Sequence, residues 1–464
     1  MNLSRRQFLG SAGAAGVLAA TGGWRYSARA GQLVVPPPAP DKSGIEHIVV
    51  VMMENRSFDH FLGWLPGADG RQAGLTFRDA KGRTHGTYSL SGEYNGCAHP
   101  DPDHSYEGGR AQYDHGAMDG WLHNGSGDDT FALGYYGAAD RPFMSRLALN
   151  YTTLDRYFCS ILAETYPNRF FMHAATTDRL HNMGTTMTSL SPTIWDRLSA
   201  KGVSARYYFS DLPFLALWGT KYLSTSAHYT QFLADAAAGT LPAVSFVDPR
   251  FETETAPADI PGAPNDTGGG TSGDDHPHGD IRAGDAFLGQ IFKALTTGPN
   301  WANTVLVVNY DEWGGFFDHV APPRVAASAK VDTDVVKGQS LLGFRVPCII
   351  ASPFTKGHPS SPRVYGTPQR QRVPFDHTSV LKLIEWRFGL APLTARDATP
   401  AANGGVGNVL DAFDFGHPDA SVPADIPFPL PPAPDPCGPN NPFPLSSGPD
   451  DTWGALRRSG LLAG

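Results

Sequence analysis

Two strongly apolar segments of this chain each run into a pair of polar side chains. Residues 46–53 and 304–310 are dominated by Val, Ile, Leu and Met, which is typical of central strands in a parallel sheet with both faces covered. The pairs that follow are Glu54 with Asn55 and Asp311 with Glu312. Because α/β sheets bind ligands beyond the carboxyl ends of their strands, we expect the two pairs to meet at one edge of the sheet.

The four side chains offer oxygen ligands to a metal ion. Carboxylate and amide oxygens suit hard divalent cations such as Ca²⁺, Mg²⁺ or Mn²⁺. Adjacent strand residues point to opposite faces, but the backbone turns at the end of a strand, and both side chains can then face one ion. The alternative is that they are ordinary polar groups at strand ends. We predict a metal site, because both pairs follow the two most apolar strands.

The pattern between these segments indicates an α/β domain. With 464 residues, of which 41% are hydrophobic, the chain can form one large domain of this class. Apolar runs alternate with helix-like stretches from residue 44 to residue 415. The predicted strands are 46–53, 152–158, 204–209, 243–247, 304–310 and 346–351, and the predicted helices are 191–200, 226–238, 281–297 (capped by Asp280) and 377–388.

The first 30 residues have the features of an export signal and are left out of the fold. Arg5 and Arg6 form a twin-arginine pattern, residues 10–23 are weakly hydrophobic, and residues 28–30 (Ala-Arg-Ala) resemble a cleavage site. The apolar run is shorter than the ~20 residues of a membrane span, which argues against an N-terminal anchor. We expect export by the twin-arginine translocase, a periplasmic or secreted protein, and no transmembrane segment in the mature chain.

The remaining chain is predicted to form one unit with a C-terminal extension. The predicted parts are the signal peptide 1–30, a domain over 31–416, and a Pro-rich strap over 417–464 that packs on the same domain. Residues 251–280 are an open stretch rich in Gly, Pro and Asp, and long loops of this kind tend to be functional.

Charge and cysteine content exclude two classes of site. The formal net charge is −9, and an acidic chain lacks the basic surface that binds nucleic acid or anionic membranes. The four cysteines form no CxxC pair, which argues against a cysteine zinc site. One or two disulfides are compatible with export, and the apolar surroundings of Cys159 and Cys348 are compatible with buried thiols.

A threonine and two histidines are candidates for chemistry beside the ion. Thr165 lies shortly before Pro167, which could open a helix, and a helix N-terminus favours an alkoxide and binds phosphate oxygens. The ordinary role of a threonine there is an N-cap, and the residues alone favour that role. His104 and His276 have acidic neighbours, and a histidine can protonate a leaving oxygen or hold a phosphate oxygen near neutral pH.

Six sequence blocks resemble the bacterial phosphoesterase family, which includes secreted phospholipases C and acid phosphatases. Residues 54–63 (Glu-Asn-Arg-Ser-Phe-Asp-His-Phe-Leu-Gly) resemble the signature of the family. The blocks 101–106, 165–169, 275–277 and 310–320 follow in the order of the family, and 376–390 is also similar to it. The resemblance covers about residues 44–392 and implies an alkaline-phosphatase-like fold, a three-layer α/β sandwich with a mostly parallel sheet.

The resemblance also implies a role for each site residue. Glu54, Asn55, Asp311 and Glu312 would hold one divalent metal ion, which could be Ca, Mg, Mn or Zn. Thr165 would attack phosphorus to form a covalent phospho-threonine that water hydrolyses. His104, Asp275 and His276 would bind phosphate or assist the leaving group.

Two features depart from the pattern of the family. Ala163 and Glu164 replace a common Gly-Pro, which puts a carboxylate beside an anionic substrate, and Trp313 is expected to narrow the pocket. We predict an exported metal-dependent phosphoesterase of phospholipase C type acting on a phospholipid. An acid phosphatase acting on phosphomonoesters is the alternative, and a non-catalytic protein that binds phosphorylated ligands is the second alternative.

Overall fold

The computed structural model describes residues 36–123, 129–182, 188–251, 272–360, 362–365, 373–433 and 437. The described residues from Pro37 onward belong to one compact unit, to which everything below refers. The signal peptide predicted over residues 1–30 lies outside the described residues, as does most of the predicted open stretch 251–280.

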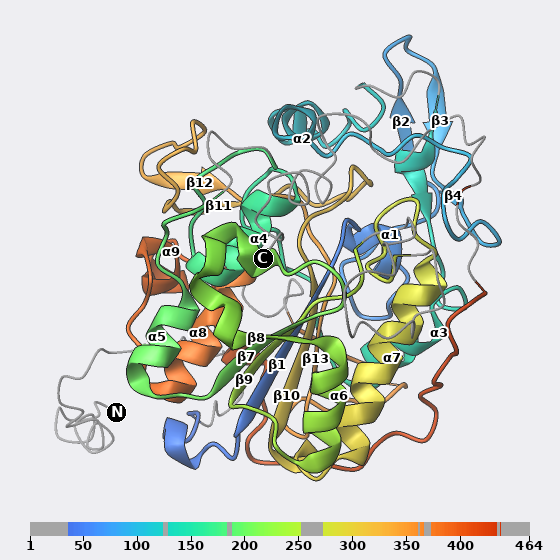
Figure 1. Cartoon of the computed structure of the whole chain (residues 1–464). Coiled ribbons are helices and arrows are strands. Elements are labelled where there is room, and N and C mark those ends of the chain that lie inside the picture. The colour runs from blue at the N-terminus through green and yellow to red at the C-terminus, as the bar shows by residue number, and fades with distance from the viewer. Residues whose placement is uncertain are drawn as a thin grey trace, which may run out of the picture. The chain divides into compact units, whose positions relative to one another are not determined.

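An eight-stranded sheet forms the centre of this unit (Figure 1). In sheet order its strands are β14 (Arg363–Tyr365), β6 (Thr152–Leu154), β13 (Cys348–Ala351), β10 (Thr304–Tyr310), β1 (His47–Met53), β9 (Val244–Val247), β7 (Ala205–Phe209) and β8 (Ser226–His228). β13 is antiparallel to both of its neighbours, and the other pairs are parallel. The mostly parallel α/β sheet predicted from the sequence is therefore confirmed.

The two most apolar strands are neighbours in the middle of the sheet. β1 and β10 run parallel, in a register that pairs His47 with Thr304 and Met53 with Tyr310. Every residue of β10 is buried, and so is every residue of β1 after His47. Because both strands end at the same level, the residues that follow them leave the sheet side by side.

Helices cover both faces of the sheet (Figure 1). On one side, α3 (Pro142–Asn150) packs against α7 (Ile281–Thr297), which also contacts α6 (Tyr229–Ala238). On the other side, α4 (Thr165–Ala174) contacts both α8 (His377–Phe388) and α5 (Ile194–Lys201). The layers are those of the predicted α/β sandwich.

Smaller elements surround this core. They are the helices α1 (Phe58–Leu62), α2 (Tyr106–Tyr113) and α9 (Ala395–Ala398), and three two-stranded sheets, β2 (Thr76–Arg78) with β3 (Thr84–Gly86), β4 (Tyr88–Ser89) with β5 (Gly134–Tyr135), and β11 (Arg324–Ala326) with β12 (Gln339–Leu341). Figure 1 places α2 and the β2–β3 hairpin at the end of the sheet where α1 follows β1.

Two helices have their predicted bounds because their caps are visible in the sequence. α7 begins after Asp280, whose side chain accepts a hydrogen bond from the Arg282 amide. α8 begins after Asp376, which forms a capping box with Ser379, and it ends at Gly389 in the left-handed conformation. Such caps satisfy the amide and carbonyl groups that the ends of a helix leave without partners.

Other predicted bounds were wrong by a few residues. The strand predicted over 152–158 ends at Leu154, and Tyr157 and Phe158 form only isolated bridges. The helix predicted over 226–238 begins at Tyr229, because Ser226–His228 pairs with β7 as an edge strand. Tertiary pairing thus overrides the local pattern at these ends.

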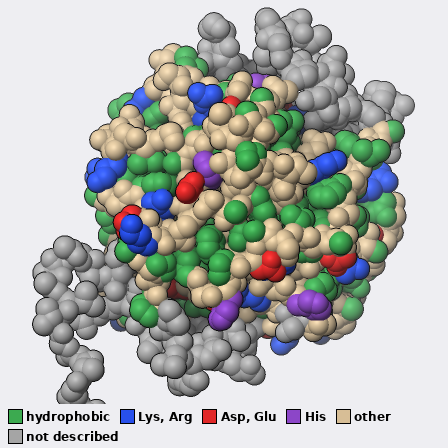
Figure 2. Space-filling view, turned by 90° about the horizontal axis from the view of Figure 1, so that it is seen from below, with side chains coloured by type: hydrophobic (Ala, Val, Ile, Leu, Met, Phe, Trp, Pro, Cys, Tyr) green, Lys and Arg blue, Asp and Glu red, His purple; other side chains and the backbone are tan. Residues whose placement is uncertain are grey.

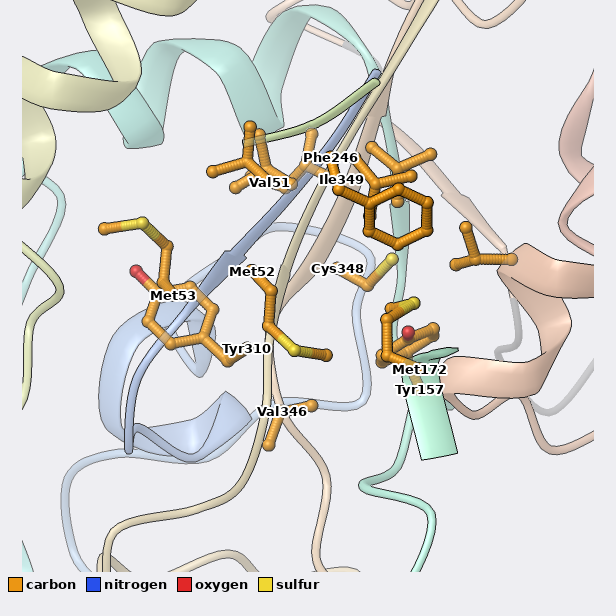
Figure 3. Packing of buried hydrophobic residues seen from close by; sticks show 14 of the residues in the cluster. Val51, Met52, Met53, Tyr157, Met172, Phe246, Tyr310, Val346, Cys348 and Ile349 are labelled. Atoms are coloured by element: carbon orange, nitrogen blue, oxygen red, sulfur yellow. The ribbon is translucent and has the colours of Figure 1, made fainter. Parts of the chain in front are cut away.

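Dense apolar packing surrounds the strand ends (Figure 3). Figure 3 shows Met53 of β1 and Tyr310 of β10 together on one side of the strands, and Met52 of β1 nearer to Cys348 of β13 and Met172 of α4, which lie on the other side. All five are at most 2% exposed. Close packing leaves little room for side chains to shift, so it holds the strand ends in one arrangement.

The cysteines divide into one bridge and two buried thiols. Cys97 and Cys437 form a disulfide, and Cys159 and Cys348 are free and buried, as their apolar surroundings indicated. The bridge joins the C-terminal segment to a loop that precedes His104.

The described part of the predicted strap lies against α3 and its neighbours. Asp425 forms an ion pair with Arg146, and the ring of Phe428 contacts Phe143. Residues 434–436 and 438–464 lie outside the described residues, and the domain boundary at residue 416 stays a prediction. Figure 2 shows single charged side chains of both signs scattered over the described part of the face opposite to that of α2.

The buried imidazole of His173 predicts an acid-sensitive fold. His173 lies in α4 among the rings of Trp195, Phe214 and Phe246, and burial together with the charge of Arg169 lowers its pKa to about 3. Below pH 6.5 the unfolded chain protonates this ring and the folded chain does not, so stability falls as the pH drops. Between pH 7 and pH 5 the loss is about 2 kcal/mol. Urea unfolding of the His173→Phe variant should show a pH dependence weaker by that amount, and an unchanged dependence would contradict the assignment.

Candidate active site

The structure brings the two predicted ligand pairs together at the ends of β1 and β10. Glu54, Asn55, Asp311 and Glu312 are all fully buried. The Asn55 amide donates a hydrogen bond to Asp311 Oδ1 at 3.2 Å, and the Asp311 amide donates to the Met53 carbonyl at 3.1 Å. The in-register pairing of the strands therefore continues one residue beyond the sheet.

Sharp backbone turns follow each strand. Asn55 has a φ of 57°, in the left-handed region that asparagine tolerates better than most residues, so Glu54 and Asn55 do not point to opposite faces. Gly314 and Gly315 also have positive φ. A Cβ atom at Gly314 would lie 2.1 Å from the Asn55 carbonyl oxygen. Only glycine allows this approach, which closes the second turn onto the first.

A buried arginine holds the acidic residues in place. Arg169 of α4 contacts three carboxylates, with Nε 3.0 Å from Asp311, Nη2 3.2 Å from Glu54 and Nη1 3.3 Å from Asp248. Arg169 belongs to the family-like block 165–169, but no role was predicted for it. Its position four residues after Thr165 was a usable signal, because residues at that spacing share one face of a helix.

The charge of this cluster fits a bound cation. Three buried carboxylates, those of Glu54, Asp248 and Asp311, share the guanidinium group of Arg169. The buried carboxylate of Glu312 adds a fourth negative group, which interacts with Asp311. Burial raises the pKa of Asp311 to about 6 and raises that of Glu312 well above its ordinary value. Glu312 Oε2 accepts a hydrogen bond from the Gly314 amide, and among the described residues Oε1 has no hydrogen-bond partner. A divalent cation would neutralise the excess charge and use this oxygen.

Thr165 lies beside the first ligand pair. It is the first residue of α4, and its hydroxyl donates to Asn55 Oδ1 at 3.5 Å. The N-cap of the helix is Glu164, so the alternative that Thr165 caps the helix is wrong. A buried hydroxyl at the positive end of a helix dipole, next to a cation site, has the environment of an activated nucleophile.

His104 and His276 lie on the Glu312 side of the cluster. His104 Nε2 is 4.0 Å from Glu312 Oε1, and the two imidazole rings are 5.8 Å apart at T-shaped geometry. His276 Nε2 is 3.7 Å from Asp101 Oδ2. Asp101, His104 and His276 form one of two groups that could hold a metal ion among the described residues. The other comprises Asp59, Asp318 and His319.

Asp275 has its hydrogen-bond partners outside the group of Asp101, His104 and His276. Its Oδ2 accepts hydrogen bonds from the Tyr310 hydroxyl at 2.5 Å and from Arg141 Nη1, which lies 2.8 Å away, and its carbonyl accepts one from Arg56. Burial raises its pKa despite the nearby Arg141. The partners of Asp275 among the described residues thus tie its loop to α3 and β10, and its predicted contact with phosphate stays a prediction.

The sequence was compared with models of known protein families. The model of the phosphoesterase family matches residues 45–391. The chain belongs to the phosphoesterase family. Membership confirms the prediction of a hydrolase acting on phosphoric esters.

Relatives of this phosphoesterase cover most of its length. Phospholipase C B from Mycobacterium tuberculosis (strain CDC 1551 / Oshkosh) is 30% identical over 90% of this chain and 86% of its own. Non-specific phospholipase C6 from Arabidopsis thaliana is 30% identical over 78% of this chain and 71% of its own. The solved structure of a protein in the alkaline phosphatase superfamily from Vibrio parahaemolyticus has a TM-score of 0.35 and 11% identity, covering 78% of this chain and 74% of that chain.

Glu164, the first departure of this phosphoesterase from its family, has a hydrogen-bond donor for each of its carboxylate oxygens. Glu164 Oε1 accepts a hydrogen bond from His181 Nδ1 at 2.7 Å, and Oε2 accepts one from the Asn182 amide at 2.5 Å. Asn182 in turn accepts a hydrogen bond from the Tyr166 amide in the first turn of α4. The carboxylate beside Thr165 is therefore held by its own partners, and burial raises its pKa.

The second departure lies in the core. Trp313 is fully buried, its Nε1 donates to Gln112 Oε1 at 2.8 Å, and its ring contacts Phe344. A Cβ atom on Gly109 would lie 2.9 Å from the indole ring, so the glycine makes room for it. The indole packs into the protein and has a buried partner for its N–H group, and the expectation that Trp313 narrows the pocket stays a prediction.

Replacing Arg169 by methionine should strongly destabilise the phosphoesterase. The change leaves the carboxylates of Glu54, Asp248 and Asp311 buried without their shared counter-ion, which costs about 3–5 kcal/mol. Urea unfolding measures the loss. The matched control is Arg146→Met, which removes an exposed ion pair with Asp425 and should cost about 1 kcal/mol or less. Equal losses in both variants would contradict the proposed importance of Arg169.

Proposed function

We propose that this phosphoesterase is a phospholipase C that cleaves the phosphodiester bond of phospholipids through a covalent phospho-threonine at Thr165. The placement of the Thr165 hydroxyl carries the proposal, because it lies at the N-terminus of α4, 3.5 Å from Asn55 and beside a buried acidic cluster. Relatives named phospholipase C that align with most of the chain support the diester as substrate.

Glu54, Asn55, Asp311 and Glu312 would hold the divalent ion, whose identity is open among Ca²⁺, Mg²⁺, Mn²⁺ and Zn²⁺. When bound, it would neutralise charge on the phosphate group and favour the alkoxide of Thr165. Arg169 keeps Glu54 and Asp311 in position and partly balances their charge, so the site does not repel an anionic substrate as strongly.

The reaction proceeds in two displacements at phosphorus. Thr165 Oγ1 forms a bond to phosphorus while the bond to the diacylglycerol oxygen breaks, and the proton that the Thr165 hydroxyl loses is passed to that oxygen. Water then attacks phosphorus, the bond to Thr165 breaks, a proton of the water returns to Thr165 Oγ1, and the phosphorylated head group leaves. His104 and His276 lie on the Glu312 side, where they would meet the phosphate or the leaving oxygen. Asp275 would position the loop of His276 through Tyr310 and Arg141.

We further propose export by the twin-arginine route to the periplasm or the medium. The disulfide between Cys97 and Cys437 supports an oxidising compartment, where such bonds persist. Among the described helices, none has the length and apolar character that crossing a membrane requires.

Hydrolysis of p-nitrophenylphosphorylcholine and p-nitrophenyl phosphate by the purified mature protein tests the function. The diester should turn over, chelation should abolish the activity, and Thr165→Ala should lower kcat by at least about 10³-fold, because the nucleophile is lost. Thr165→Ser should retain part of the activity. The control is Thr176→Ala, which changes a threonine just beyond α4 and should leave kcat unchanged.

The other outcomes decide between the alternatives. Turnover of the monoester alone would identify an acid phosphatase. Absence of turnover of both substrates with every added divalent ion would favour the second alternative, a protein that binds phosphorylated ligands without cleaving them. Diester turnover that survives in Thr165→Ala would exclude the phospho-threonine.

A further inference from the structure

A buried carboxylate lies beside the proposed nucleophile. Glu164 is the N-cap residue of α4, directly precedes Thr165 in the chain, and is 3% exposed. Its Oε2 atom accepts a hydrogen bond from the Asn182 amide at 2.5 Å, and the side chain of Asn182 accepts one from the Tyr166 amide at 2.8 Å. The carboxylate is therefore fixed against the first turn of the helix that carries Thr165.

The hydrogen bonds of Glu164 are those of a negatively charged group. A backbone amide only donates hydrogen bonds, so Oε2 is an acceptor. Oε1 lies 2.7 Å from His181 Nδ1, and an imidazole binds a proton more tightly than a carboxylate does, so the hydrogen atom between them belongs to the ring. Burial raises the pKa of Glu164, and the hydrogen bonds from Asn182 and His181 act against that rise because they stabilise the charged form.

The charge of Glu164 acts on the site. Its carboxylate interacts electrostatically with His104, which lies on the Glu312 side of the cluster, as well as with His181. His181 Nε2 in turn lies 3.6 Å from Glu107 Oε1 of α2. A histidine carries a full positive charge mainly below neutral pH, so the negative charge of Glu164 is compensated least on the alkaline side.

The repulsion from this carboxylate depends on the charge of the substrate. A phosphodiester carries one negative charge, whereas a phosphomonoester gains a second one above its second pKa of about 6. Glu164 is not one of the four proposed metal ligands, so the ion does not bind it directly. At alkaline pH the fixed charge therefore repels a monoester about twice as strongly as a diester in the same position.

We propose that Glu164 is a specificity-determining residue that makes this phosphoesterase favour phosphodiesters over phosphomonoesters. The inference rests on the proposed function and names the charge class of its substrate, a phosphate group with a single negative charge. The Gly-Pro pair that is common at this position in the family provides no such charge. Glu164 forms no bond during the reaction and acts on the substrate only through its electric field.

Glu164→Gln tests the charge with little change in shape. The amide oxygen of the new side chain can accept from the Asn182 amide, and its NH₂ group can donate to His181 Nδ1 in the other tautomer of the ring. The substrates are methyl p-nitrophenyl phosphate and p-nitrophenyl phosphate, which share a leaving group and contain no positive group. At pH 8 we expect kcat/KM to rise for both, and the ratio of diester to monoester kcat/KM to fall about tenfold.

The pH dependence separates the effect of charge from a structural role. Near pH 5 both substrates carry about one negative charge, so the difference in this ratio between wild type and Glu164→Gln should shrink to less than about twofold. A change that only disturbed the position of Thr165 would give the same difference at both pH values.

Two further variants support the comparison. Glu107→Gln removes a carboxylate that is 70% exposed, and because water screens its charge, the ratio should change by less than about twofold. Glu164→Pro removes the buried charge in a different way. The φ of −62° at Glu164 is the value that a proline ring imposes, so the backbone accepts the change. Its ratio at pH 8 should fall in the same direction as that of Glu164→Gln.

Three results would overturn the inference. They are an unchanged ratio in both Glu164 variants, an equal fall in Glu107→Gln, and a difference between wild type and Glu164→Gln that persists at pH 5. Calorimetry of phenyl phosphate and methyl phenyl phosphate binding to metal-loaded Thr165→Ala, with and without Glu164→Gln, gives the same comparison without turnover. A failure of the phospholipase C assignment would appear as absent diester turnover in the wild type, and the calorimetric comparison would still test the charge.

Discussion

The in-register parallel pairing of β1 with β10 is the constraint on which the site depends. Because Met53 lies opposite Tyr310, Glu54 and Asp311 leave the sheet at the same level. Side chains alternate between the two faces of a strand, so a slip of one residue would turn the ligand groups away from each other. The apolar side chains of Figure 3 oppose such a slip, since it would change their burial on both faces.

The same arrangement concentrates negative charge, and α4 supplies a positive charge that partly balances it. One face of this helix carries Thr165 at its first position and Arg169 one turn later. The guanidinium of Arg169 holds Glu54 and Asp311, while the hydroxyl of Thr165 meets Asn55. The nucleophile and the counter-ion are thus positioned by one rigid element. The remaining negative charge at Glu312 is what the metal ion of the proposed function would neutralise.

Local signals in the sequence were sufficient for much of the fold and for the position of the ligand pairs. The apolar runs of β1 and β10 and the caps of α7 and α8 are each encoded within a few residues. The direction of β13 was not predicted, because four apolar residues give the same pattern in either direction. The role of Arg169 was missed because its partners come from three separate strand ends. Asp275 and His276 diverge because Asp275 adopts a φ of 79°, which no pattern reveals.

Mass spectrometry of the enzyme quenched during turnover tests the central claim most directly. The tryptic peptide over residues 157–169 contains Thr165. With a phosphorylcholine ester as substrate, the account predicts that this peptide gains the mass of a phosphorylcholine group and that fragment ions place it on Thr165. An adduct on any other residue, or rapid turnover with this peptide unmodified at every quench time, would contradict a phospho-threonine mechanism.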